Sequence, residues 1–267
     1  MLKASIRLAS LGLAVAAMGL PASAAAAPAV TLKVKVVPIP TNPSNSKSAT
    51  YPGTGNILGA GAAIESVFKI KGVEYGGFPL PLKQVIFYLP AGTKIHTQGF
   101  AKCPTSILES HEVQKCPKKS VAGPKGSALG VVSFGSTRVP ETVTVQPFFS
   151  SNGLAFFAEG RSPASIELLS QGSLTSASGP FGQKLTAEVP LVATVPGAPY
   201  GSVEEIKVKV GAAFKQKGKL VSYGTVPKKC PKGGFKIKAE LTFGAEEGPT
   251  GETVPVTTTI PCPKKKK

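Results

Sequence analysis

Apolar and polar residues alternate with a period of two along much of the chain. In the longest such run, Phe235 to Phe243, every second residue is apolar and the intervening ones are lysine, glutamate or threonine. The same alternation runs from Val30 to Val36 and from Gln84 to Leu89. Successive side chains of an extended chain point to opposite faces, so these segments predict β-strands with one buried face.

Shorter segments of the same character predict the remaining strands, at 64–71, 128–134, 141–149, 154–159, 166–169, 185–189, 203–210, 220–223 and 253–260. Residues 38–61 have no period and are rich in Pro, Ser, Thr and Gly, which predicts a loop. With 25 Pro and 30 Gly spread through the chain, turns are frequent and long helices are excluded.

Strands separated by turn signals, with no amphipathic helices between them, predict an all-β protein, an antiparallel β-sandwich of immunoglobulin-like or similar type. A Gly-Ser-Thr break near Gly135 to Arg138 suggests two sandwich units, residues 28–135 and 136–263. A single continuous sandwich is the alternative.

The N-terminus has the pattern of a secretory signal peptide, assigned to residues 1–24. Lys3 and Arg7 precede an apolar run of about 13 residues, short of the roughly 20 that span a bilayer. Small residues follow, and cleavage is expected after Ala24 or Ala26. We therefore expect a secreted protein, extracellular or associated with the cell wall, with no transmembrane segment after cleavage.

The four cysteines are expected to form two disulfides in an exported chain. Sequential pairing, Cys103 with Cys116 and Cys230 with Cys262, needs the fewest long closures. A zinc site is the rival, but the spacing lacks the short Cys-x2-4-Cys knuckle. Each cysteine precedes a proline, which holds the cysteine extended. One short helix is predicted between the first two cysteines, with Pro104 near its first turn.

The chain is strongly basic, with a formal net charge of +17, and nearly all of the positive charge is lysine. Lysine lacks the planar fork that reads phosphates and base edges, so specific nucleic-acid recognition is not expected. A solvated, lysine-covered sheet face is one explanation, and loose attraction to anionic cell-wall polymers is another. Residues 264–267 form a basic tail.

No constellation of catalytic, metal-binding or cofactor-binding residues is found in the sequence. All 14 acidic residues are Glu, which excludes Ser-His-Asp triads, Asp-rich calcium loops and aspartic dyads. The only two histidines, His96 and His111, are expected to be ordinary surface residues. The adjacent pairs at 204–205 and 246–247 do not suit a glycosidase, because neighbours on a strand point apart.

Several stretches resemble an uncharacterised family of secreted actinobacterial proteins with paired Cys-Pro motifs. The resemblance lies in Gly99 to Pro104, in Cys116 to Gly123, and in Pro227 to Phe235 with the terminal Pro-Cys. These motifs are structural, so the resemblance implies no activity.

The sequence thus favours a monomeric, non-catalytic extracellular β-sandwich protein without cofactors. The first alternative is a hydrolase of wall polymers that uses a Glu and one histidine. The second is an extracellular carrier of a small apolar ligand, which requires a sizeable cavity between the sheets.

Overall fold

The computed structural model describes residues 27–42, 45–50, 57–134, 137–247 and 251–263. This part of the chain is mostly antiparallel β-structure, which confirms the predicted all-β class. The strands are β1 (Ala29–Val37), β2 (Ile39–Asn42), β3 (Asn45–Thr50), β4 (Ala63–Lys71), β5 (Leu82–Pro90), β6 (Lys94–Ile95), β7 (Gly126–Phe134), β8 (Thr137–Ser150), β9 (Gly153–Gly160), β10 (Ile166–Ser176), β11 (Phe181–Glu188), β12 (Ser202–Val210), β13 (Ala213–Gln216), β14 (Lys219–Ser222), β15 (Gly224–Thr225), β16 (Phe235–Phe243) and β17 (Glu252–Ile260).

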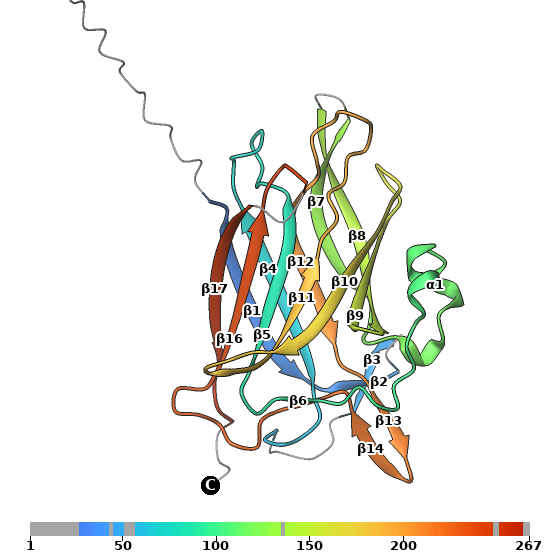
Figure 1. The fold of residues 1–267 in the computed structure, drawn as a ribbon, viewed down its shortest axis with the longest axis vertical. Coiled ribbons are helices and arrows are strands. Elements are labelled where there is room, and N and C mark those ends of the chain that lie inside the picture. Colours follow the sequence, from blue (N-terminus) through green and yellow to red (C-terminus); the bar gives the residue numbers. More distant parts are fainter. Residues whose placement is uncertain (1–26, 43–44, 51–56, 135–136, 248–250, 264–267) are drawn as a thin grey trace, which may run out of the picture.

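Eleven of these strands form one sheet, in the order β1-β4-β12-β7-β8-β9-β10-β11-β5-β16-β17. The sheet curls until β1 and β17 lie side by side, so that it is nearly closed (Figure 1). Because every neighbouring pair is antiparallel and the number of strands is odd, β1 and β17 run in the same direction. They are not joined by a hydrogen-bonded ladder in the described residues. We call this eleven-stranded structure the rolled sheet and the β1–β17 junction its seam.

The two sandwich units predicted from the sequence are not confirmed. Strand β12, from the predicted second unit, lies between β4 and β7 of the first, and β5 of the first lies between β11 and β16 of the second. The predicted break near Gly135 falls in the short β7–β8 connection, which joins two paired strands through Phe134 and Thr137. Alternation identifies the buried face of a strand but not its neighbour, and for this reason the pattern could not reveal the interleaving.

Most strands lie where the alternation predicted them, and β16 has the same bounds as its predicted segment. Its apolar face is buried, with Leu241 and Phe243 fully inaccessible. The loop predicted at 38–61 instead contains the β2–β3 pair, and the β13 strand was also missed. The signal peptide and the basic tail lie outside the described residues.

A packed core fills the part of the rolled sheet next to the seam. Strands β1, β4, β5 and β16 contribute its buried residues: Leu32, Phe68, Ile70, Leu82, Ile237, Ala239, Leu241 and Phe243. At its inner boundary, Phe68 on β4 meets Phe87 on β5 edge to face, with ring centroids 6.3 Å apart. Since β4 and β5 are not neighbours in the sheet, this contact joins two opposite walls of the roll.

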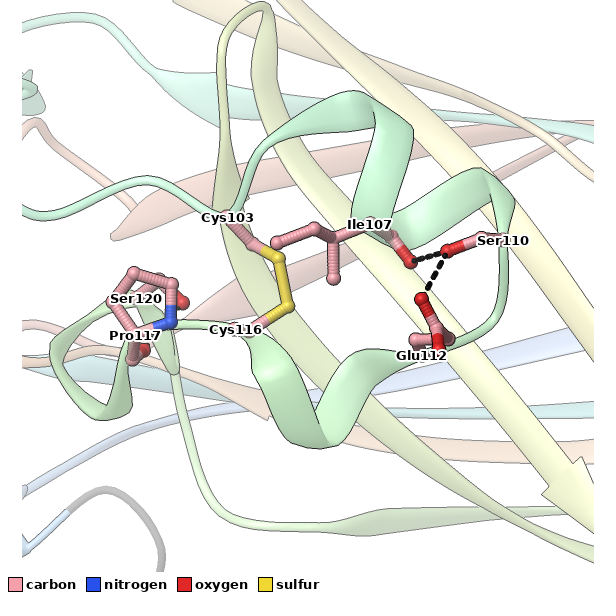
Figure 2. The surroundings of a disulfide bond; sticks show 7 residues. All are labelled: Cys103, Ile107, Ser110, Glu112, Cys116, Pro117 and Ser120. Atoms are coloured by element: carbon pink, nitrogen blue, oxygen red, sulfur yellow. Dashed lines mark hydrogen bonds between the residues drawn. A yellow bond between two sulfur atoms is a disulfide. The ribbon is translucent and has the colours of Figure 1, made fainter.

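The predicted Cys103–Cys116 disulfide is confirmed, with a Cα–Cα distance of 5.0 Å. It closes a lobe that contains α1 (Thr105–Glu109) and the 3₁₀ turn η1 (Val113–Lys115), and is followed by η2 (Lys118–Ser120) (Figure 2). The short helix predicted between the first two cysteines is present, and Pro104 occupies its N-cap position, next to the first turn as expected. Leu108 and the disulfide pack on Phe148, Ala155 and Phe157, which point outward from β8 and β9.

The Cys230–Cys262 disulfide is also confirmed, with a Cα–Cα distance of 5.8 Å. It joins the loop before β16 to the residues that follow β17. The bridge thus fixes the end of the last strand at the seam.

Candidate functional site: an apolar cavity inside the rolled sheet

Next to the packed core, the rolled sheet surrounds a cavity of about 250 Å³, with Phe68 belonging to both. Its wall draws on eight strands of the sheet, β4, β5 and β7 to β12. The apolar side chains that line it include Ile64, Phe68, Val85, Phe87, Leu89, Val143, Val145, Leu154, Phe156, Leu168, Leu174, Leu185, Val203, Ile206, Val208 and Val210.

The lining follows directly from the alternating pattern. On β5, the cavity is lined by Val85, Phe87 and Leu89, whereas Tyr88 between them faces outward. In the packed core, the inward-facing apolar side chains of this pattern fill the interior, whereas around the cavity they leave space between them. Inward-facing residues such as Phe87 and Ile206 remain only half-buried, because they pack against the core on one side and border the cavity on the other.

Few polar groups reach the cavity. Ser66 is buried in its wall, and the Ser170 hydroxyl donates a hydrogen bond to the Glu188 carbonyl oxygen at 2.5 Å. A cavity with so few hydrogen-bonding groups holds water poorly, since a buried water needs two to four polar partners. The interior is therefore suited to hydrocarbon surface.

An aromatic cluster closes the end of the cavity near the β13–β14 hairpin. Tyr223 stacks against Phe149 with centroids 4.6 Å apart, and Phe100 lies between Phe149 and Phe214 of β13. Tyr223 lines the cavity on one side and a separate hollow of about 130 Å³ on the other. Burial raises the pKa of Tyr223 to about 12. Its hydroxyl has no hydrogen-bond partner among the described residues.

The opposite end of the cavity adjoins a hollow of about 80 Å³, which shares Val143, Leu168 and Val203 with the main cavity wall. Glu141 borders this hollow and is only 3% exposed. One carboxylate oxygen accepts a hydrogen bond from the Ala164 backbone N–H at 2.9 Å. Glu141 is the one acidic residue that the structure buries among the described residues, and nothing in its sequence context signalled it.

The two histidines do not take part in the cavity. His111 lies on the lobe outside the sheet, with its Nδ1 atom 3.3 Å from a Glu167 carboxylate oxygen on β10. Arg161 contacts the same carboxylate at 3.2 Å. Glu112 follows His111 in the sequence, but the carboxylate that the structure brings to its ring is that of Glu167. A Glu–His pair therefore exists, but its side chains are about one-third exposed on the outer surface and line none of the three hollows.

His111 has a structural role at the end of α1. Its φ of 60° is left-handed, and its N–H bonds to the Leu108 carbonyl while that of Glu112 bonds to the Ile107 carbonyl. These two bonds form a Schellman motif, which satisfies the last carbonyls of a helix. His96 is exposed, and its backbone N–H bonds to the Tyr223 carbonyl.

The paired glutamates form no carboxylate site in the described residues. A bulge between Val203 and Glu205 interrupts the alternation that the sequence argument assumed. Glu205 forms an ion pair with Lys69 at 3.3 Å. Glu246 and Glu247 lie in the β16–β17 connection and line none of the three hollows.

One outward-facing network links β5 and β16. The Tyr88 hydroxyl donates to Glu240 at 2.7 Å, and Lys238 lies 2.5 Å from the same carboxylate. The hydrogen bond to Glu240, with burial and the carboxylate charge, raises the pKa of Tyr88 to about 12. Burial alone would raise the pKa of Glu240, but the hydrogen bonds from Lys238 and Tyr88 and the nearby lysine charges outweigh it and lower that pKa.

Within the part of the chain that the structure covers, no three His, Cys or Glu side chains gather as a metal site would require. All four cysteines are in disulfides. Among the described residues, no helix is long and apolar enough to cross a membrane.

Comparison of the chain with protein-family models, curated proteins and solved structures found no match.

Proposed function

We propose that this protein is an extracellular, non-catalytic binding protein that holds a small apolar molecule inside its rolled sheet. The observation that carries the proposal is the cavity of about 250 Å³, lined almost wholly by aliphatic and aromatic side chains. Of the three functions weighed from the sequence, only the apolar carrier required such a cavity.

The volume limits the size of the ligand. It lies between a cavity of about 150 Å³, which takes benzene, and the pockets of roughly 300 to 1,000 Å³ that hold drug-sized molecules. A compound of one or two rings, or a short acyl chain, fits this range. The shortage of polar groups favours a ligand with little hydrogen-bonding capacity.

The extracellular location is supported by the two disulfides, since such bridges persist in oxidising compartments. It is also supported by the signal-peptide pattern of residues 1–24. A hydrolase is less well supported, because the Glu167–His111 pair lies on the outer surface instead of in a hollow that could hold a substrate. The monomeric state and the attraction to wall polymers stay predictions.

The proposal is tested by titrating the oxidised, mature protein with 1-naphthylamine, a two-ring compound whose fluorescence changes in apolar surroundings. This probe is neutral, so the lysine excess does not attract it as it would an anionic dye. We expect saturable binding of one molecule per chain.

Two neighbouring residues on β7 provide the variant and its control. Ala128 lines the cavity, and Leu129 is 40% exposed on the other face. Ala128→Leu is expected to weaken probe binding at least ten-fold, whereas Leu129→Ala leaves it unchanged. Equal binding by wild type and Ala128→Leu, or loss of binding in Leu129→Ala alone, would place the probe on the surface and refute the proposal.

A further inference from the structure

Charge is distributed unequally between the two ends of the rolled sheet. Residues 211–239 contain eight lysines and no glutamate. The connections at the opposite end carry Glu74, Glu246, Glu247 and Arg161, and Arg138 lies there at the start of β8.

The topology explains why the lysines gather at one end. Antiparallel strands alternate in direction, so the segments after β5 and after β12 leave the sheet at the same end. The two segments are joined there, because β6 pairs with β15 and Phe100 packs on Phe214. We call the exposed lysines of residues 91–102 and 211–234 the basic end; they are Lys94, Lys102, Lys215, Lys217, Lys219, Lys228, Lys229 and Lys232.

Three of these lysines lie on the β13–β14 hairpin, which projects beyond the sheet (Figure 1). Lys215 lies on β13, Lys219 begins β14, and Lys217 with Gly218 forms the two-residue turn between them. The ion pairs that the structure shows for lysines lie on other surfaces, such as Lys69–Glu205, Lys209–Glu65 and Lys238–Glu240. Among the described residues, no ion pair involves Lys215, Lys217 or Lys219, so the hairpin presents concentrated positive charge.

We propose that the basic end binds a flexible extracellular polyanion with closely spaced phosphate groups. Lysines are mobile point charges, which suit a flexible chain of phosphates better than a single oriented ligand. A membrane is the less favoured partner, because Leu220 is the only large apolar side chain exposed at this end among the described residues. Interfacial binding normally combines basic groups with an inserted apolar face.

Binding of this kind depends steeply on salt. Displacement of counterions gives a slope of about −0.7 in log affinity against log salt for each phosphate contacted on a flexible chain. Removing three contacting lysines is therefore expected to reduce the steepness of that slope by about 2.

The test uses long-chain inorganic polyphosphate and two triple variants of equal charge change. Lys215→Gln, Lys217→Asn and Lys219→Gln neutralise the hairpin; asparagine is chosen because Lys217 has a φ of 48°, which asparagine tolerates. The control, Lys33→Gln, Lys35→Gln and Lys207→Gln, removes three exposed lysines from the outer face of β1 and β12.

At low salt we expect the hairpin variant to lose at least ten-fold in affinity and the control less than three-fold. Equal losses would show that net charge alone attracts the polymer and would overturn the proposal. So would tighter binding to phosphatidylglycerol vesicles than to polyphosphate, since a lipid surface would then be the partner. Probe binding in the cavity is measured separately on the same variants and is expected to be unchanged.

Discussion

Replacing Ala158 by leucine tests whether the interior of the rolled sheet is incompletely filled. Ala158 lies on β9, lines the cavity and is half-buried. Its side chain points into space bordered by other apolar groups, so a larger side chain can extend there without displacing neighbours. In a filled core the same change would cause steric overlap.

Two independent routes give a similar magnitude for this change. Leucine adds three carbon atoms, and burial contributes about 0.8 kcal/mol per methylene, or roughly 2 kcal/mol in all. Alternatively, removing about a third of the cavity at about 24 cal/mol per Å³ also yields about 2 kcal/mol. We therefore expect Ala158→Leu to raise the free energy of unfolding of the unliganded protein by up to about 2 kcal/mol.

The matched control is Ala155, on the same strand but on the opposite face. It is fully buried against Phe148 and the Cys103–Cys116 lobe. Leucine at this position overpacks a filled cluster, which typically costs about 1 to 3 kcal/mol. The two substitutions are chemically identical and are expected to have opposite signs.

The measurement is guanidinium unfolding of the oxidised proteins, followed by circular dichroism because the chain has no Trp. With a saturating apolar probe, wild type is expected to gain stability and Ala158→Leu to gain little. If Ala158→Leu destabilises the protein as much as Ala155→Leu, side chains already fill the interior and the cavity argument is wrong.

Three further predictions concern stability. Replacing Cys103 and Cys116 by serine releases a loop with a separation of 13 residues and is expected to cost about 3 kcal/mol on the loop-entropy model, measured by denaturant unfolding. Tyr223→Phe removes a buried hydroxyl that lacks a described partner, so stability is expected to stay level or rise by about 1 kcal/mol. Because the pKa of Tyr223 is raised, wild type is expected to lose stability as the pH rises from about 10 to about 12, and the Phe variant to lose less; equal alkaline slopes would contradict this. The pKa of Glu240 is lowered in the folded protein, so the ionised carboxylate stabilises the fold above the ordinary carboxyl pKa, and this stabilisation is lost as the pH falls through the lower folded value. Glu240→Gln is therefore expected to flatten the acid limb of a stability–pH profile, by less than about 1 kcal/mol because the pair with Lys238 is partly exposed. An unchanged acid limb would show that the network is not coupled to folding.

The sequence predicted local features well. Alternation around Phe87 and Leu241 identified their buried faces, because the two-residue period is a property of the single strand. The cysteine pairing and the helix behind Pro104 followed from spacing and proline geometry in the same way.

Features that depend on distant segments could not be predicted. Neither the position of β12 between β4 and β7 nor the approach of Glu167 to His111 has a signature in nearby residues. The cavity could not be predicted either, because an inward-facing valine such as Val208 stands in the same alternating sequence pattern whether the side chains around it fill the interior or leave space. From the sequence alone, a carrier of a small apolar ligand was therefore only one of the alternatives.

The parallel alignment of β1 and β17 has a mechanical consequence. At the ten other junctions of the roll, separating two strands breaks a ladder of backbone hydrogen bonds, whereas β1 and β17 are held together mainly by side chains such as Val30 and Val254. Widening of the circumference to admit a bulkier guest would thus begin at this junction, because the Cys230–Cys262 bridge links the segments of β16 and β17 and does not cross to β1. Backbone amides of β1 and β17 should then exchange with deuterium faster than those of β9, which has a ladder on both sides.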